Sequence, residues 1–242
     1  KDSNNALFPY YTDDKITESY EITGSKSIFH VHKGNRDYLW EPFTKTSDFV
    51  YQNNRNLYKN LRGNKIIFEE INNDLGIKFS YQWTTCDKYG FIKTSSIKNL
   101  NNEDISVTLL DGIQNILPWG LDEGIQSNTS NLADAYKRNE LDRNSKIGIF
   151  ALSATIVDRA EPSEALKSNV VFHLGLKENK ILLSSLQLDK FRKGFNVDEE
   201  TDVKAEKGAY FIHSFLTLES GQKKDWVLAA DISKSSSDIL KL

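Results

Sequence analysis

Apolar and polar residues alternate over most of the chain, which is the pattern of β-strands that bury one face. In residues 77–83, Phe79, Tyr81 and Trp83 fall on one face, and the polar side chains between them fall on the other. The polar turn "NNDLG" separates this stretch from residues 65–71, so the two segments should form a hairpin. This spacing predicts two face-to-face sheets in which Phe79, Tyr81 and Trp83 share a face.

Similar stretches, separated by polar turns, continue toward the C-terminus. Successive strands with turns of this kind indicate an antiparallel sandwich rather than a parallel sheet. We therefore predict an all-β fold, with further strands at residues 90–100, 105–110, 146–158, 169–175, 180–185, 208–220 and 224–232.

Helical signals are sparse. In residues 127–142, Ser and Asn capping residues precede Leu132, Ala135 and Tyr136 at helical spacing, which predicts one short helix on a connection between strands. The segment "SKSSSDILKL" (233–242) carries capping residues followed by the first turn of a helix. We expect an extension over 1–25, one sandwich domain over 26–232, and the start of a linker helix over 233–242.

The strand at 105–110 runs on into "ILPWG", and two aromatic positions stand out. Pro118 cannot donate to a sheet ladder, so Trp119 should lie where a strand ends. There it could pack under a loop or against another domain, or stack on a sugar ring. Trp40 in "YLWEPF" presents the same alternatives, whereas Trp83 and Trp226 lie within strands and are expected in the core.

Composition narrows the possible partners. The chain has 242 residues and a formal net charge of −3, so it shows no basic footprint for nucleic acid. Its single cysteine, Cys86, excludes an internal disulfide or a Cys-rich zinc site. No run approaches the roughly 20 apolar residues of a membrane helix. We expect no nucleic-acid or membrane partner, in a soluble chain of the cytoplasm or periplasm.

The motifs of nucleotide-binding loops and of the hydrolase nucleophile elbow are missing from the sequence. The four histidines do not form a recognisable catalytic or metal-binding pattern either. His30 and His32 share a strand face but lack a clear third metal ligand. His173 and His213 lie among apolar residues and suit hydrogen-bonded positions on a sheet. We expect no metal, no cofactor and no catalytic residue in this chain.

Carboxylates occur in pairs that sequence alone cannot bring together. Glycoside hydrolysis needs two of them roughly 5–9.5 Å apart, and the pairs at 69–70 and 122–123 are candidates. Asp122 and Glu123 directly follow Trp119. The predicted residues for carbohydrate binding or docking are Tyr38, Trp40, Trp119, Asp122 and Glu123.

Three segments in order, "YLWEPF" (38–43), residues 95–119 and residues 213–239, resemble the N-terminal domain of glycoside phosphorylases of the cellobiose and chitobiose phosphorylase type. The resemblance implies a galactose-mutarotase-like β-supersandwich that precedes a catalytic (α/α)6 barrel. The chain departs from the family pattern at Glu41, where a serine is usual, and in "ILPWG".

The resemblance implies a non-catalytic domain of a large carbohydrate-active enzyme, either a phosphorylase or a hydrolase. Such a domain would contribute carbohydrate binding, docking onto the helical barrel of the same polypeptide, or homodimerisation. A free-standing carbohydrate-binding module, or a sugar mutarotase or epimerase, remains the alternative.

Overall fold

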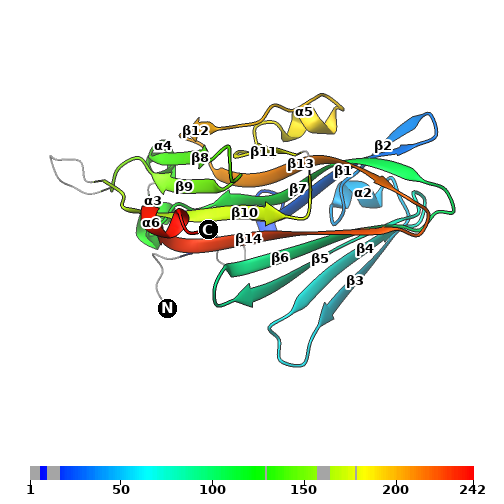
Figure 1. Ribbon diagram of the computed structural model, residues 1–242, viewed down its shortest axis with the longest axis horizontal. Helices are drawn as coiled ribbons and strands as arrows, with labels where there is room; N and C mark the ends of the chain where they lie inside the picture. Colours follow the sequence, from blue (N-terminus) through cyan, green and yellow to red (C-terminus); the bar gives the residue numbers. More distant parts are fainter. Residues whose placement is uncertain (1–5, 10–16, 129, 157–163, 178) are drawn as a thin grey trace.

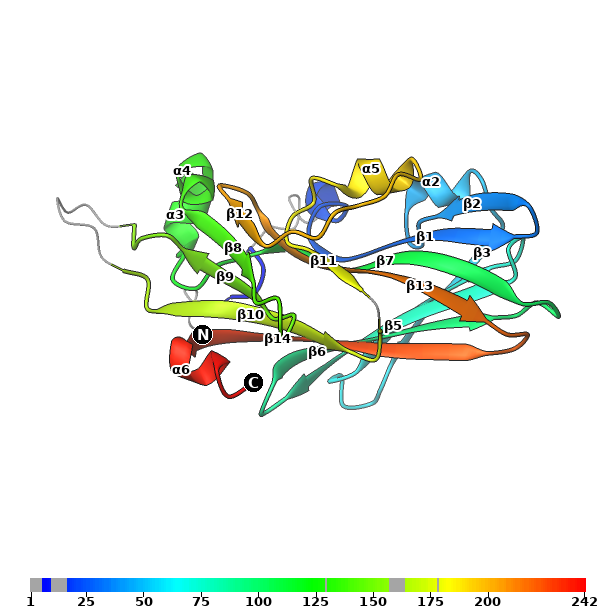
Figure 2. The same ribbon diagram turned by 45° about the horizontal axis from the view of Figure 1, so that its top comes forward.

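The computed structural model describes residues 6–9, 17–128, 130–156, 164–177 and 179–242. It consists of two antiparallel sheets packed face to face, as Figure 1 and Figure 2 show. The five-stranded sheet has the order β11 (Lys180–Leu182), β13 (Gly208–Leu218), β7 (Ile105–Ile116), β1 (Gly24–Lys33), β2 (Arg36–Trp40). The nine-stranded sheet has the order β12 (Asp202–Lys204), β8 (Lys137–Leu141), β9 (Gly148–Leu152), β10 (Lys167–Leu174), β14 (Lys223–Ser235), β6 (Gly90–Asn99), β5 (Ile77–Cys86), β4 (Ile66–Asn72), β3 (Asn53–Lys59). The predicted antiparallel supersandwich is confirmed.

The helices are short and more numerous than the two predicted, which were one helix on a connection and the start of a helix over 233–242. They are α2 (Lys45–Asp48), α3 (Glu123–Asn128), α4 (Ser130–Ala135), α5 (Leu188–Arg192) and α6 (Ser236–Ile239). None of the helices in the described ranges is long and apolar enough to cross a membrane.

The helix predicted over 127–142 is wrong in its second half, which forms β8. There Lys137, Asn139 and Leu141 are buried in alternation, and the strand pairs with β9 on one side and β12 on the other. One ladder partner, β9, follows β8 directly in the chain as a hairpin, and the other, β12, comes from a distant part of the chain; together these pairings outweigh the local helical spacing. The strand predicted over 146–158 is also too long, because β9 ends at Leu152 and residues 157 and 158 lie outside the described ranges.

The main core fills the space between the sheets. Phe79 and Ile97 from the nine-stranded sheet meet Phe29, Val107 and Leu109 from the five-stranded sheet, and all are fully buried. A second cluster lies between the outer face of the five-stranded sheet and α5, where Phe191 and Leu188 pack on the sheet. The smaller sheet is therefore covered on both faces near α5.

A buried polar network centred on Asp111 crosses the main core. Asp111, on β7, accepts hydrogen bonds from Lys93 Nζ at 2.7 Å, Ser95 Oγ at 2.8 Å, Trp226 Nε1 at 2.7 Å and Ser27 Oγ at 2.5 Å. The Lys93 and Asp111 side chains have no exposed surface. Burial lowers the pKa of Lys93, and the charge of Asp111 opposes that shift. Three of the donors belong to the nine-stranded sheet and one to β1, so the carboxylate links the two layers.

Lys93→Met should lower the free energy of unfolding by about 3–5 kcal/mol, because it leaves a buried carboxylate without its counter-charge. Lys98→Met, on the opposite face of β6, is the matched control and should change it by less than about 0.5 kcal/mol. Urea unfolding of the two variants measures the difference. Equal stabilities would show that the buried pair does not hold the sheets together.

Candidate functional site

The structure does not bring the five predicted site residues together. Trp40 pairs with Phe29 on β1, and Phe29 pairs with Leu109 on β7. From Leu109 the strand continues to Ile116 before Trp119 is reached, which is roughly 20 Å of extended chain. Figure 1 likewise shows β2 and α3 at opposite ends of the molecule.

Trp40 is a core residue in this structure. Its ring has no exposed surface, lies 5.4 Å from the ring of Phe29, and donates from Nε1 to Glu70 at 3.1 Å. Tyr38 is half-buried and packs against the same core. Neither residue therefore offers the open aromatic face that sugar stacking needs.

The other three candidates lie around the start of α3. Trp119 is half-buried, with Lys167 Nζ 5.1 Å from the centre of its ring. Asp122 accepts a hydrogen bond from the backbone N–H of Ile125 at 2.8 Å, and Glu123 is exposed. Asp122 therefore acts at the helix start, where a carboxylate satisfies a free backbone donor.

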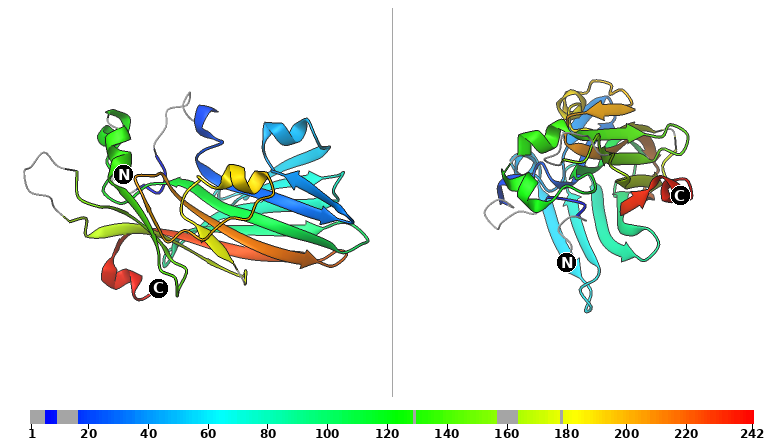
Figure 3. Two further views of the ribbon diagram at one scale, coloured as in Figure 1. Left: turned by 90° about the horizontal axis from the view of Figure 1, so that it is seen from above. Right: turned by 90° about the vertical axis from the view of Figure 1, so that its left-hand side faces the viewer.

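Two cavities in the structure are lined by residues of β5 that the sequence pattern assigns to the core. Along the inner face of β5, Phe79 has no exposed surface, whereas Tyr81 and Trp83 are half-buried and line cavities. Figure 1 and Figure 3 show why, because β3 to β6 fan away from the five-stranded sheet. Trp83 is thus only in part the core residue that was expected, since it packs against the main core and also lines a cavity, while Trp226, with 1% exposure, lies fully in the core.

The first cavity is an open groove of about 600 Å³ around Trp83, which we call the Trp83 groove. Apolar rings and chains make up most of its wall, and hydroxyl and amide groups border them. Cys86, at the end of β5, is exposed beside Thr85. The groove is lined by Ala6, Leu7, Phe8, Gly63, Asn64, Ile66, Trp83, Thr84, Thr85 and Phe91.

The second cavity, the Tyr81 pocket, has a volume of about 360 Å³ and lies where β1 and the turn after β2 face β5. Tyr81 stacks on Phe68 at 4.9 Å between ring centres, and Phe43 meets Tyr81 edge-on at 5.4 Å. The pocket is lined by Ser19, Tyr20, Glu21, Thr23, Ser25, Lys26, Ser27, Pro42, Phe43, Thr44 and Tyr81.

The turn that presents Phe43 is held by Glu70, one of the carboxylates considered as a catalytic candidate. Phe43 has φ 64°, a left-handed backbone conformation that is rare for a bulky side chain. Its N–H donates to Glu70 at 2.7 Å, and Arg55 Nε donates to the same fully buried carboxylate at 2.6 Å. Glu70 is thus occupied with structure, and the strain at Phe43 is imposed by its surroundings.

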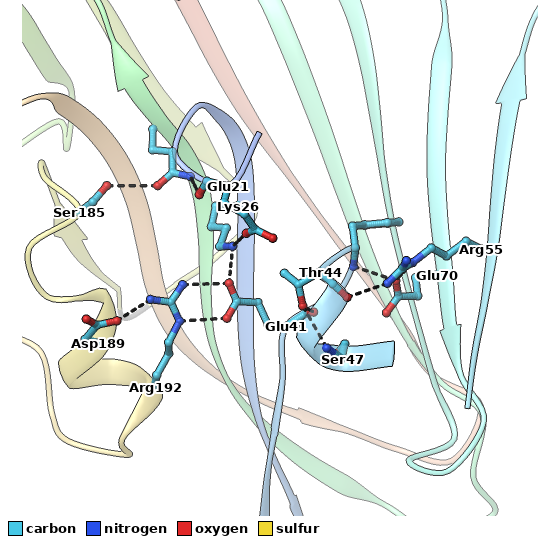
Figure 4. Close-up of polar contacts among 12 residues, drawn as sticks. Glu21, Lys26, Glu41, Thr44, Ser47, Arg55, Glu70, Ser185, Asp189 and Arg192 are labelled. Carbon is cyan, nitrogen blue, oxygen red and sulfur yellow. Dashed lines mark hydrogen bonds and ion pairs between the residues drawn. The ribbon is translucent and has the colours of Figure 1, made fainter. Parts of the chain in front are cut away.

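Glu41, the residue that departs from the phosphorylase pattern, anchors the other side of this turn. Arg192 of α5 donates to its two carboxylate oxygens at 3.0 and 2.9 Å, and Lys26 forms an ion pair with both Glu41 and Glu21. Figure 4 shows Lys26 between the two carboxylates. Burial would raise the pKa of Glu41, but the hydrogen bond from Arg192 and the charge of Lys26 lower it overall.

The Tyr81 phenol is a neutral group. Burial raises the pKa of Tyr81 above its usual range, the nearby Ser25 hydroxyl opposes that shift in part, and the charge of Asp111 makes a smaller contribution that raises it. Lys93 Nζ lies 5.3 Å from the centre of the Tyr81 ring. The Asp111 network therefore lies directly behind the pocket, whose Ser27 hydroxyl it also binds.

The histidines make structural hydrogen bonds. His30 contacts Asp37 at 3.0 Å and the carbonyl of Phe191 at 2.8 Å, and His32 contacts Thr108 at 2.9 Å. Within the described ranges, no group of three His, Cys, Asp or Glu residues is arranged to hold a metal ion. The pair at 30 and 32 therefore remains without a third ligand there.

His173 donates to a tyrosine in the sheet interior. The Tyr210 hydroxyl donates its proton to the carbonyl of Lys146 at 2.6 Å, so the contact of 2.8 Å from His173 Nδ1 has to be an N–H donor. Burial, and then the charge of Lys146, lowers the pKa of His173 to about 4. His213 is shifted in the same direction by burial and Lys180.

Comparisons with known proteins find structural likeness only. No protein-family model matches the chain, and no curated protein matches it. Among solved structures, a polysaccharide lyase has 11% identity and a TM-score of 0.49, with 96% of this chain covered. The chain spans only 29% of the length of that lyase.

Two further solved structures have weaker similarity. A galactose mutarotase-like protein from Clostridium acetobutylicum has 14% identity and a TM-score of 0.43, over 93% of this chain and 83% of that one. A 4-alpha-glucanotransferase from Thermococcus litoralis has 8% identity and a TM-score of 0.27, over 93% and 31%. None of the three is a phosphorylase, and similarity this low leaves function to be inferred from the chain's own side chains.

The strain at Phe43 can be measured by comparing two variants that both remove the ring. Phe43→Gly should be more stable than Phe43→Ala by about 1 kcal/mol, because only glycine accepts a positive φ without steric cost. Urea unfolding of both variants gives the difference directly. An alanine variant as stable as the glycine variant would show that the turn relaxes to ordinary backbone geometry.

His173 should make folding sensitive to acid. Its pKa is lower in the folded protein, so the unfolded chain takes up the proton first, and stability is lost as pH falls from about 6.5 to about 4. His173→Asn should reduce this loss by about 2 kcal/mol after allowance for solvent screening. Measuring the free energy of unfolding of both proteins at pH 7 and pH 4.5 tests this prediction. An identical pH dependence in variant and parent would contradict the assignment of the acid sensitivity to His173.

Proposed function

We propose that this chain is a carbohydrate-binding domain of a larger carbohydrate-active enzyme, and that the Trp83 groove holds the sugar chain. The observation that carries the proposal is the presence of three aromatic rings, Trp83, Phe91 and Phe8, in one open groove with the hydroxyls of Thr84 and Thr85. Aromatic faces suit the apolar faces of sugar rings, and a few polar groups fix orientation.

The dimensions of the groove support a chain rather than a single ring. Its volume of about 600 Å³ lies well within the roughly 300–1,000 Å³ of small-molecule sites, and it is open to solvent along the uncovered end of the nine-stranded sheet. Phe91 is 36% exposed, so part of its ring is already available to a ligand. A polymer could therefore enter and leave along the groove.

Binding rather than turnover is the role we propose for the groove. Its lining contains no carboxylate and no histidine among the described residues, and the polar groups are hydroxyls and an amide. These groups donate and accept hydrogen bonds but are poor general acids and bases at neutral pH. The reaction in the whole enzyme, phosphorolysis or hydrolysis, would then belong to the helical domain that the sequence resemblance implies.

The region around Trp119 keeps its proposed role in docking that helical domain. Trp119 is half-buried and Leu166, next to the lysine over its ring, is 74% exposed. This region lies at the end of the molecule opposite β2 and close to one wall of the groove, because Leu117 donates its N–H to the carbonyl of Leu7, which lines the groove. Trp119 itself is not among the described lining residues, so its ring serves as a control.

Trp83→Ala should weaken binding of a soluble hexasaccharide by tenfold or more, because the largest ring of the groove is lost; tenfold corresponds to about 1.4 kcal/mol. The probes are cello-, xylo-, manno- and malto-hexaose, and their binding is measured by calorimetry and tryptophan fluorescence. Trp83→Phe, which keeps an aromatic face, should retain most of the affinity.

Trp119→Ala is the matched control and should bind as the parent does. Circular dichroism confirms that each variant is folded. If no hexasaccharide binds the parent, or if Trp119→Ala loses binding while Trp83→Ala keeps it, the groove is not the carbohydrate site.

A further inference from the structure

We propose that the Tyr81 pocket is a second ligand site, separate from the Trp83 groove, that takes a single uncharged sugar ring. The proposal rests on the proposed carbohydrate function for the kind of ligand, but on different residues for the site. The pocket and the groove have no lining residue in common, although Tyr81 and Trp83 lie two positions apart on one face of β5.

The size of the Tyr81 pocket limits the ligand. Its volume of about 360 Å³ is near the lower end of the range for small-molecule sites. Phe43 and Tyr81, which meet edge-on, form an aromatic corner, and Tyr20 stands at the rim with 44% exposure. A space of this size and shape fits one ring with its hydroxyls, not an extended chain.

An enclosed hydroxyl supplies the strongest indication of a ligand. Ser25 Oγ is shielded from solvent and makes no hydrogen bond of good geometry within the described part of the chain, although the Tyr81 hydroxyl lies close enough to influence it. Its neighbours are engaged, because Ser27 donates to Asp111 and Thr44 donates to the carbonyl of Glu41. An enclosed polar atom is expected to have a partner, and a ligand hydroxyl in the pocket would provide one.

The backbone at Phe43 is the second, independent indication. A left-handed conformation at a bulky residue is strained, and such strain clusters at ligand sites. Here the buried Glu70 imposes it by binding the N–H of Phe43, and the result is that the ring forms a wall of the pocket. A turn that served packing alone could use a residue without this strain.

The charges around the pocket select against an acidic sugar. Among the described lining residues Lys26 is the only cation; it is 6% exposed and lies between the carboxylates of Glu21 and Glu41. Lys93, behind Tyr81, is fully buried and paired with Asp111. The more accessible charge is Glu21, with 37% exposure, and it would repel a ligand carboxylate.

The test uses ligand-observed NMR with methyl glycosides of glucose, galactose, mannose and xylose, and with glucuronic acid as the charged probe. Tyr81→Phe and Ser25→Ala each remove one hydroxyl and keep the fold, which thermal melting verifies. Each should weaken binding of the preferred neutral glycoside by about tenfold, the usual effect of one lost hydrogen bond. Trp83→Ala should leave monosaccharide binding unchanged, while it weakens hexasaccharide binding.

Three outcomes would overturn the second site. In the first, no monosaccharide binds although hexasaccharides do. In the second, monosaccharide binding is lost in Trp83→Ala but kept in both hydroxyl variants. In the third, glucuronic acid binds as well as the neutral glycosides. The first leaves the groove proposal intact. Conversely, monosaccharide binding with no hexasaccharide binding would refute the groove and retain the pocket.

Discussion

The buried carboxylate of Asp111 is the interaction on which the rest of the structure depends. A charge with no exposed surface is tolerated only when it is paired and fully hydrogen-bonded, and here four donors meet it from both sheets. Apolar faces could pack in several registers, whereas this network fits one. It therefore fixes how β5 and β6 lie against β1, and so it also fixes the back wall of the Tyr81 pocket.

The two cavities follow from the difference in width between the sheets. Nine strands cannot be covered by five, so the inner face of β3 to β6 continues beyond the smaller sheet. Phe79 lies in the covered part, and Trp83, four positions further along β5, lies in the uncovered part. One regular strand thus passes from the core to the lining of a cavity without any change in its alternation.

The fold was predictable from sequence because strand alternation is a local property. The hairpin around residues 72–77, the face shared by Phe79, Tyr81 and Trp83, and the antiparallel pairing all follow from it. Strand β8 was not predicted, because its pairing with β12 comes from a distant part of the chain and leaves no local signal, although β9 follows it directly as a hairpin partner. Local spacing there suggested a helix instead.

The candidate site was less predictable than the fold, because it too depends on contacts between segments that are far apart in the sequence. Whether an aromatic residue on an inner face is covered depends on the extent of the opposite sheet, which no local pattern records. Trp40 was considered for sugar stacking or docking because of its place in "YLWEPF", yet it is buried against Glu70. A partial signal was present at Trp83, since two threonines and the exposed Cys86 follow it on β5.

The position of that cysteine has a practical consequence. Cys86 is the chain's single thiol, it is exposed, and its neighbour Thr85 lines the Trp83 groove. A maleimide dye or spin label would therefore attach at one defined place at the mouth of the groove, with no engineered residue. Oxidation of the same exposed thiol would join two molecules through an intermolecular disulfide between two hairpin tips, which a reducing buffer prevents.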